Sequence, residues 1–237
     1  VISRRARSER RAGAGPRAMK WKQDFFLSAL GDVAPAALIN LRLALLAFTL
    51  AVLGGTVLTL IRSLKIRPVN LLIAVVISFI RGTPLIIQIF LFFYALPAAG
   101  IDLGPMTAGV LAIAFNSAVF ITEIQRGSLA AIDPGLIEAA TALGLKARPI
   151  WWKVVLPQLF RRILPMLMNE ATVVVKGTAL LSIITVVEMM RRAQQIGSAN
   201  FSPFEPLVAA ALFFLAINLV LGSGASALER RFATQRA

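Results

Sequence analysis

The chain has 237 residues, of which 58% are hydrophobic and only 15% charged. A soluble domain of this length usually carries about a quarter charged residues, so the composition favours a membrane protein. The absence of histidine and cysteine excludes haem with histidine ligands, ordinary zinc sites, iron–sulfur clusters, disulfides and Ser-His-Asp or Cys-His catalysis, and we expect no metal site. The net charge of +14 fits a cytoplasmic loop bias better than it fits nucleic-acid binding.

The N-terminal stretch VISRRARSERRAGAGPRA is rich in Arg, Ala and Gly. It contains almost nothing to bury, so residues 1–18 are expected to be a disordered basic extension. Met19 opens the next segment, residues 19–36, which has the pattern of an amphipathic approach to a first span. We interpret Met19 as the native start; the alternative is a genuine basic tail that binds anionic membrane lipid.

Long apolar runs dominate the rest of the chain. Stretches of about 18 or more apolar residues are typical of membrane-spanning helices. They predict an all-α polytopic membrane protein with about five transmembrane helices in residues 37–228 and a cytoplasmic tail at 229–237. The expected spans are residues 38–61, 82–98, 104–125, 163–190 and 205–228.

The second apolar run is too long for one straight crossing. From Val69 to Pro97 a helix would exceed about 40 Å at roughly 1.5 Å per residue, against a hydrocarbon core of roughly 30 Å. The sequence RGTP, which ends at Pro84, lies inside this run. We therefore expect a helix over Val69–Ile80 at or below the inner interface, followed by a kink at Pro84.

The distribution of positive charge predicts the topology. With five spans, one side of the membrane receives twelve cations: Arg62, Lys65, Arg67, Arg126, Lys146, Arg148, Lys153, Arg161, Arg162, Arg230, Arg231 and Arg236. The other side receives four cations if translation starts at Met19, and ten if residues 1–18 belong to the protein. Because short cytoplasmic loops carry the excess of Lys and Arg, we expect the N-terminus outside and the C-terminus in the cytoplasm.

One basic, amphipathic segment, EAATALGLKARPIWWKVVLP, separates two apolar runs. A helical apolar face comprises Leu136, Ile137, Ala139, Ala140, Leu143 and Leu145. Gly144 interrupts the pattern where a glycine can take the left-handed geometry that ends a helix. A second short helix is expected after Pro149, ended or kinked at Pro157. Two short helices joined at a glycine near the membrane form a rigid unit that can transmit the movement of a partner.

The spacing of this segment resembles the EAA loop of the membrane subunits of ABC importers. The matching residues are Glu138, Ala139, Ala140, Gly144, Leu156 and Pro157, with Val154 where the pattern prefers isoleucine. We assign residues 126–160 to this loop and call it the EAA loop. Four other stretches resemble the polar amino-acid branch of the family (histidine/glutamine/arginine type): RGTPLIIQIFLFFYALP, TEIQRG, LPQLFRRILPMLMNE and VKGTALLSIITVVEM. The similarity runs from about Met19 to Phe232.

Three positions depart from the family pattern. Leu136 stands where glutamine is usual, Val119-Phe120 replaces a small–aromatic pair, and Ala179 stands where serine is usual. None of these positions changes the EAA spacing. They leave the transported amino acid unassigned.

The resemblance implies a permease subunit of an ATP-driven importer of polar amino acids or related small zwitterions in the bacterial inner membrane. The six matching residues would then contact an ATP-binding ABC subunit, present in two copies that carry ATP and Mg²⁺. A second permease, identical or paralogous, and an extracytoplasmic solute-binding protein would complete the assembly. The chain has no Walker A pattern, so we expect neither a cofactor on this chain nor enzymatic activity from it.

Ionisable residues inside spans are costly and mark pathways or partners. Arg81, Glu123 and Glu170 are expected at similar depth near the inner interface. We predict that Arg81 pairs with Glu123 or Glu170; the alternative is that each side chain reaches water separately.

Lys176 lies near the middle of the fourth span and is expected to face a cavity or a subunit interface. The stretch Lys176-Gly-Thr-Ala-Leu-Leu repeats the pattern of Arg81-Gly-Thr-Pro-Leu-Ile. This similarity suggests an internal structural repeat that lines a substrate path. Further candidates for that path are Thr83, Gln88, Asn116, Thr178 and Glu188.

Alternative functions make different use of the same residues. An ion-coupled secondary transporter or channel would use Lys176, Glu170 and Glu188 as an ion relay and would need no ATPase. An intramembrane enzyme is a second alternative, but the chain has no histidine, no cysteine and no paired aspartates within a span to support it. A membrane assembly protein without a transport role is a third, and it would tolerate a change at Gly144. The EAA spacing favours the importer.

Overall fold

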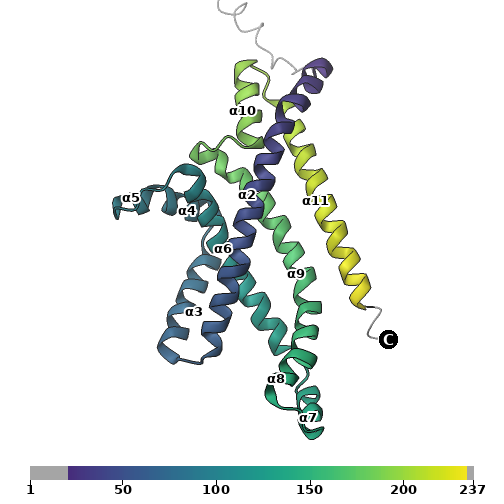
Figure 1. Cartoon of the computed structure of the whole chain (residues 1–237). Helices are drawn as coiled ribbons and strands as arrows, with labels where there is room; N and C mark the ends of the chain where they lie inside the picture. The colour runs from purple at the N-terminus through teal and green to yellow at the C-terminus, as the bar shows by residue number, and fades with distance from the viewer. Residues whose placement is uncertain (1–20, 234–237) are drawn as a thin grey trace, which may run out of the picture.

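The computed structural model describes residues 21–233, and every regular element in this range is a helix, as predicted (Figure 1). The elements are α2 (Gln23–Ser63), α3 (Arg67–Gly82), α4 (Leu85–Phe90), the π-helical η1 (Leu91–Ala95), α5 (Leu96–Ala98), α6 (Pro105–Ala130), α7 (Pro134–Ala142), α8 (Ala147–Ile150), the π-helical η2 (Trp151–Val155), α9 (Leu156–Gly177), the 3₁₀-helical η3 (Thr178–Ile184), α10 (Met189–Ala199) and α11 (Phe204–Ala233). The predictions for residues 1–18, for Met19 and for the last residues of the tail lie outside the described residues.

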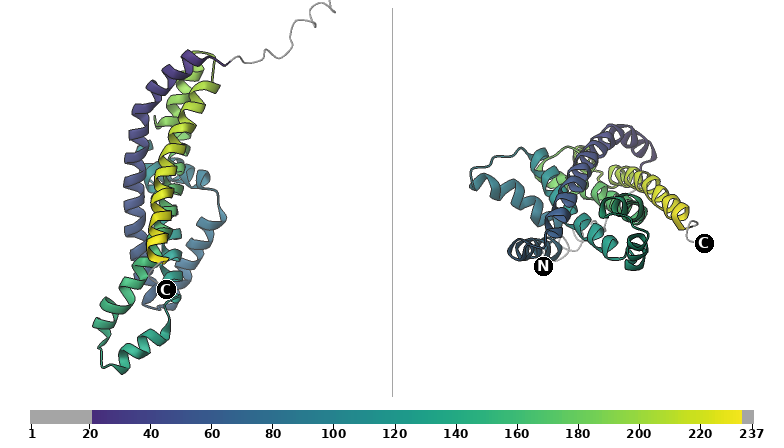
Figure 2. Two further views of the ribbon diagram at one scale, coloured as in Figure 1. Left: turned by 90° about the vertical axis from the view of Figure 1, so that its right-hand side faces the viewer. Right: turned by 60° about the horizontal axis from the view of Figure 1, so that its bottom comes forward.

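The number of membrane crossings agrees with the prediction of about five. Within the described residues, four helices are long and apolar enough to cross a membrane, and five if the bent pair of α3 and α4–α5 counts as one span. The start of α2, α10 and the start of α11 gather at one end of the molecule, which we call the α10 end (Figure 1). The short helices α7 and α8 form the opposite end, which we call the α7 end (Figures 1 and 2).

Helix α2 corrects the expected division between an amphipathic segment and a first span. It is a single helix of 41 residues, roughly 60 Å long, and Pro35 lies inside it. Its first half packs through Val33 and Ala36 on α10 and α11, where Met189 and Ala210 are buried with them. This packing stabilises the helix on both sides of the proline, because tertiary contacts contribute most of a helix's stability.

The second half of α2 packs closely against α6. A Cβ atom at Gly55 would lie 2.8 Å from the carbonyl oxygen of Ala118, so only glycine permits this approach. The Thr122 hydroxyl donates to the Ala118 carbonyl of its own helix at 2.8 Å and lies 3.2 Å from the Gly55 carbonyl. Gln125 of α6 donates to the Thr56 hydroxyl of α2 at 2.8 Å. The two helices are therefore joined along their C-terminal halves by packing and by hydrogen bonds.

The predicted kink at Pro84 is a full break. Helices α3 and α4–α5 are bent by 112° at this point. The Gln88 amide donates to the Ile80 carbonyl at 2.9 Å and to the Thr83 carbonyl at 3.2 Å, and so satisfies backbone groups that the break leaves without helical partners. Asn116 of α6 donates to Gln88 Oε1 at 2.9 Å, which holds the break against α6.

The expectation of one continuous span over residues 163–190 is wrong. Helix α9 ends at Gly177, passes into η3, and stops at Thr185, which has a left-handed backbone with φ of +68°. Glu188 then begins α10, because its carboxylate accepts hydrogen bonds from the Met190 and Arg191 amides at 2.9 and 2.8 Å. The chain thus turns into a separate helix that the hydropathy of the sequence does not show.

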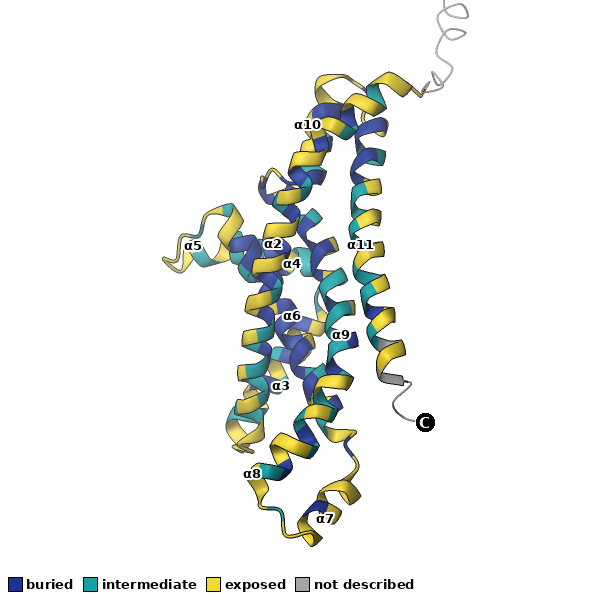
Figure 3. Cartoon of the chain, turned by 45° about the vertical axis from the view of Figure 1, so that its right-hand side comes forward, coloured by how far each residue is buried: buried dark blue, intermediate teal, exposed yellow. Residues whose placement is uncertain are grey.

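The outer surfaces of the long helices are mostly exposed in the single chain, and the buried residues gather between them (Figure 3). The central core joins α2, α4, α6, α9 and η3 through Leu43, Ile89, Ile113, Val174 and Leu181. Exposed leucines cover α2 and α11. Such surfaces are suited to lipid or to another membrane subunit.

Candidate functional site

The EAA loop forms the α7 end of the molecule (Figure 1). It leaves α6, folds into α7 and the continuous run of α8 and η2, and leads into α9. The residues that the sequence singles out for contact with a partner therefore lie together at one tip. The loop is connected to the membrane helices by α6 on one side and by α9 on the other.

The start of α7 follows ordinary helix capping. Asp133 stands at the N-cap, where its Oδ1 atom accepts a hydrogen bond from the Gly135 amide at 2.9 Å. Pro134 occupies the first helical turn, where a missing amide hydrogen costs nothing. The sequence thus determines where α7 begins.

The end of α7 confirms the left-handed geometry predicted at Gly144. This residue has φ of +77°, in the left-handed region. The Gly144 amide donates to the Thr141 carbonyl at 2.9 Å, and the Leu145 amide donates to the Ala140 carbonyl at 3.2 Å. These two bonds form a Schellman motif, which closes α7 and reverses the chain into α8.

The second helix of the loop begins earlier and ends later than expected. It starts at Ala147, before Pro149, and Pro157 does not end it, because the chain stays helical into α9. The π-helical turn Trp151–Val155 precedes Leu156-Pro157, and the Leu156 amide donates to the Trp151 carbonyl. The wider turn accommodates a proline that lacks an amide hydrogen. The same arrangement occurs before Pro97, where η1 precedes Leu96-Pro97.

A small apolar core holds the two halves of the loop together. Its buried side chains are Ile132, Ala140, Ile150 and Val155. Ala140 is therefore an internal packing residue, whereas Glu138 and Ala139 are exposed on the outer side of α7. Of the two alanines in the motif, only Ala139 is available to a partner.

The predicted apolar face of α7 is covered by the chain only in part. Leu136 and Ile137 are exposed, and Leu143 at the tip is 82% exposed. Sequence reasoning placed Leu143 on an apolar face but not among the contact residues. Together with Leu136 and Ile137, Leu143 leaves several apolar side chains of one short helix uncovered by the rest of the chain.

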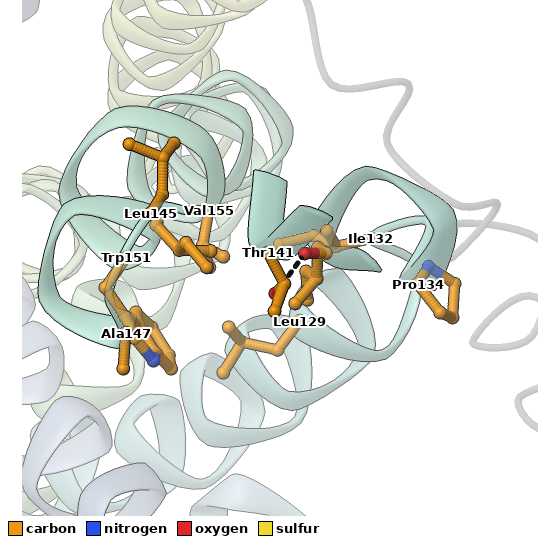
Figure 4. A pocket seen from close by; sticks show the side chains of 10 residues that line it. Leu129, Ile132, Pro134, Thr141, Leu145, Ala147, Trp151 and Val155 are labelled. Atoms are coloured by element: carbon orange, nitrogen blue, oxygen red, sulfur yellow. Dashed lines mark hydrogen bonds between the residues drawn. The ribbon is translucent and has the colours of Figure 1, made fainter. Parts of the chain in front are cut away.

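A pocket of about 470 Å³ lies between α7 and the α8–η2 run. Its lining residues come from the end of α6, from α7 and from both parts of the second helix: Leu129, Ile132, Pro134, Ile137, Thr141, Leu145, Ala147, Ile150, Trp151 and Val155. Thr141 supplies the one side-chain hydroxyl in this lining, and its Oγ1 donates to the Ile137 carbonyl at 2.7 Å (Figure 4). The side chains that line the pocket are therefore mostly apolar.

Glu123 sits between two cations, and neither of them is the predicted Arg81. Its carboxylate pairs with Arg62 of α2 at 2.5 Å and with Arg126 at 2.7 Å. Arg81 is exposed at the end of α3 and forms no ion pair with a described residue. The end of α2 delivers Arg62 to Glu123, a contact between residues 61 positions apart that a reading of single spans does not predict.

The other two ionisable residues of the predicted path differ in exposure. Glu170 is buried, and its Oε1 atom has no hydrogen-bond partner within the described residues. Lys176 is exposed on the surface of α9. Lys176 therefore faces outward from the single chain, and the cavity or subunit interface expected around it stays a prediction. Within residues 21–233 no cluster of three or more acidic side chains that could hold a metal ion is present.

Thr178 and Glu188 lie inside the chain, in a polar network that includes a residue the sequence did not indicate. Asn40 of α2 donates from Nδ2 to Thr178 Oγ1 at 2.8 Å and to Glu188 Oε2 at 2.9 Å. The Met189 amide donates to Asn40 Oδ1 at 2.8 Å. All of these side chains are buried, so they fix the break between η3 and α10. Only the rarity of an Asn in a span could have pointed to Asn40.

The two stretches of the predicted internal repeat lie in contact with each other. In both, the Gly-Thr pair lies where an α-helix ends, at Gly82-Thr83 after α3 and at Gly177-Thr178 after α9. A Cβ atom at Gly177 would lie 3.3 Å from Leu85, so the start of α4 packs against the end of α9. The interruptions of two helices are thus brought together within one chain.

Comparisons with known proteins agree with this architecture. Residues 51–234 match the model of the family described as binding-protein-dependent transport system inner membrane component. The glutamine transport system permease protein GlnP of Escherichia coli (strain K12) is 37% identical over 213 residues, covering 87% of this chain and 97% of GlnP. The arginine transport system permease protein ArtQ of Bacillus subtilis (strain 168) is 34% identical over 194 residues, covering 81% of this chain and 89% of ArtQ.

A solved structure supports the same relationship. The crystal structure of an amino acid ABC transporter with histidines contains a chain that superposes with a TM-score of 0.84 at 33% sequence identity, covering 90% of this chain and all of that one. The overall helical fold described above is therefore shared with a transporter of this kind. The chain belongs to the family of binding-protein-dependent transport system inner membrane components, and its relatives are permease subunits of amino-acid ABC transporters.

Proposed function

We propose that this chain is the permease subunit of an importer that moves polar amino acids or related small zwitterions, driven by ATP hydrolysis on a partner chain. The observation that carries the proposal is the EAA loop, in which a rigidly capped α7 presents Glu138, Ala139 and Leu143 to a partner. The named relatives transport glutamine and arginine, which supports a polar amino-acid substrate.

The ATP-binding subunit is the partner of α7, and two copies of it bind ATP and Mg²⁺. Gly144 orients α7, while Leu156 and Pro157 continue the loop into α9. Closure of the two ATP-binding subunits displaces the loop. Because α6 leads into the loop and α9 leads out of it, a displacement of the loop shifts the positions of these two membrane helices.

The substrate path follows the interruptions of α3 and α9. Broken helices expose backbone groups that can bind the charged ends of a substrate at the middle of a membrane. Lys176 supplies a cation for a carboxylate on the exposed side of α9. Gln88, Asn116, Thr178 and Glu188 are buried, and we assign them to supporting the breaks rather than to contacting the substrate.

The assembly requires a second permease, identical or paralogous, because each chain supplies one side of the path. The α7 end faces the cytoplasm together with the C-terminal tail. The α10 end and the N-terminus face outward, where a solute-binding protein delivers the substrate. This orientation follows the excess of cations near the α7 end.

The test exchanges Gly144 for valine. A β-branched residue is strongly disfavoured at φ of +77°, and no atom lies within 4 Å of the added Cβ, so the substitution disturbs the backbone of the loop without a clash. We expect Gly144→Val to lose the ATP-binding subunit during purification in mild detergent and to lose ATP-dependent uptake in proteoliposomes. Asparagine tolerates the left-handed region, so Gly144→Asn is expected to restore most of both.

The ion-coupled alternative makes the opposite prediction. It requires uptake that continues after ATP depletion and collapses with the proton gradient. If no nucleotide-binding protein accompanies the native chain and uptake survives ATP depletion, the importer proposal is refuted. If Gly144→Val removes the partner and Gly144→Asn retains it, the EAA loop is the coupling element.

A further inference from the structure

We propose that the pocket between α7 and η2 receives an apolar side chain of the ATP-binding subunit, flanked on that subunit by carboxylates that pair with Lys146, Arg148 and Lys153. This inference rests on the proposed function. It goes beyond the docking of α7, because it makes the second helix of the loop a binding surface of its own, with a chemistry opposite to that of Glu138.

The pocket is large enough to receive a large apolar side chain, and most of its lining residues are apolar. Its volume of about 470 Å³ falls within the range of ordinary ligand pockets. The Thr141 hydroxyl is already engaged with the Ile137 carbonyl, so its proton is not available to an occupant. Ile137 and Trp151 line the pocket and remain about half exposed, which leaves it accessible from the surface.

Two neighbouring tryptophans mark the same surface. Trp151 is 52% and Trp152 is 64% exposed, and neither indole forms a hydrogen bond within the described part of the chain. Tryptophan is enriched among the residues that carry most of the binding energy at protein interfaces. Two exposed indoles beside an apolar pocket therefore indicate a partner with apolar surface to bury against them.

The charge around the pocket determines the complementary surface. Lys146, Arg148 and Lys153 are exposed, and none forms an ion pair with a described residue. Between Glu138 and Glu170 the chain contains no acidic residue at all. No described side chain pairs with these three cations, so they are free to pair with carboxylates of a partner. Complementary charges of this kind orient a complex and speed its formation.

A protein partner fits the position of this surface better than the anionic inner leaflet does. The helical run from Ala147 to Ile184 has 38 residues, which is roughly 57 Å, against a hydrocarbon core of roughly 30 Å. If the core ends at Ile184, its other edge lies near Pro165. Trp152 then lies roughly 20 Å beyond that edge, whereas the headgroup layer adds only about 5–8 Å.

The test measures binding of the ATP-binding subunit that co-purifies with the native chain, after separate purification and fluorescent labelling. The permease is placed in nanodiscs of phosphatidylcholine and, in parallel, in nanodiscs that also contain phosphatidylglycerol. One variant, Ala147→Phe, fills the pocket. A second variant combines Lys146→Glu, Arg148→Glu and Lys153→Glu. The control combines Lys65→Glu with Arg67→Glu, which reverses exposed cations near the turn between α2 and α3.

We expect Ala147→Phe and the triple reversal each to weaken binding at least about tenfold in phosphatidylcholine nanodiscs, and the control to stay within about threefold. The loss in the triple reversal should shrink as salt rises from about 50 to about 500 mM, because screening weakens charge pairs, whereas the loss in Ala147→Phe should not. Thermal melting of each variant in detergent verifies that the fold is retained, and Trp151→Ala provides a second pocket variant if Ala147→Phe melts early.

Two results overturn the inference. In one, both variants bind within about threefold of the native chain at low salt while Gly144→Val does not bind; α7 alone then carries the contact, and the proposed function stands. In the other, the triple reversal weakens binding only in nanodiscs with phosphatidylglycerol, so that the cations act through lipid. If the native chain binds no ATP-binding subunit in either membrane, the proposed function itself fails.

Discussion

The buried network around Asn40 leads to a quantitative prediction for Asn40→Ala. The Asn40 side chain joins α2 to both sides of the break that follows α9. It makes three hydrogen bonds, to Thr178 Oγ1 at 2.8 Å, to Glu188 Oε2 at 2.9 Å and from the Met189 amide at 2.8 Å. Alanine removes all three without adding a clash.

The magnitude follows from the groups that lose their partners. The Met189 amide is left buried without an acceptor, which costs about 1–3 kcal/mol. Glu188 keeps two backbone donors from α10 and loses one of its three, at a cost of about 1–2 kcal/mol for a bond inside a membrane protein. Thr178 still donates to the Val175 carbonyl at 2.7 Å and contributes little. We therefore expect the free energy of unfolding to fall by about 2–5 kcal/mol.

The assay is equilibrium unfolding of the purified chain in mixed micelles with increasing SDS, followed by tryptophan fluorescence. Asn218→Ala is the matched control, because among the described residues Asn218 Nδ2 bonds only the Phe214 carbonyl of its own helix, at 2.7 Å. Its expected cost is below about 1 kcal/mol. If Asn40→Ala unfolds within about 0.5 kcal/mol of the native chain, the network does not hold the break and the reasoning is refuted.

Two further substitutions test the packing and the charges at the C-terminal half of α2. Gly55→Val places a Cβ 2.8 Å from the Ala118 carbonyl and should lower the free energy of unfolding by about 2–3 kcal/mol, whereas Gly54→Ala, whose Cβ has 3.5 Å of space, should change it by less than about 1 kcal/mol. Glu123→Ala removes the acceptor of Arg62 and should cost about 1 kcal/mol, less at high salt, because this pair is partly exposed. Both are measured in the same SDS titration.

A different result would contradict each of these two predictions. Equal costs for Gly55→Val and Gly54→Ala would mean that the two helices do not meet at Gly55. Arg81→Leu is the control for the ion pair, since Arg81 has no ionic partner among the described residues. A larger cost for Arg81→Leu than for Glu123→Ala would restore the pairing that the sequence suggested.

The features that sequence alone could predict are local ones. The apolar runs indicate helices of membrane-spanning length, because burial in lipid depends on composition over about 20 residues. Gly144, Asp133 and Pro134 set the ends of α7 through backbone geometry within a few residues. The break at Thr83-Pro84 follows from a proline and from a run too long to cross straight. The EAA spacing likewise lies within one short segment.

Tertiary structure decided the features that depend on distant neighbours. Glu123 pairs with Arg62 rather than Arg81, and the fourth span ends well before residue 190, because contacts with α2 determine both. Asn40 and Glu188 are 148 positions apart, and no local pattern connects them. Packing across the loop likewise buries Ala140 and leaves Ala139 exposed. A sequence records which groups must be satisfied, whereas only the fold determines which group, far along the chain, satisfies them.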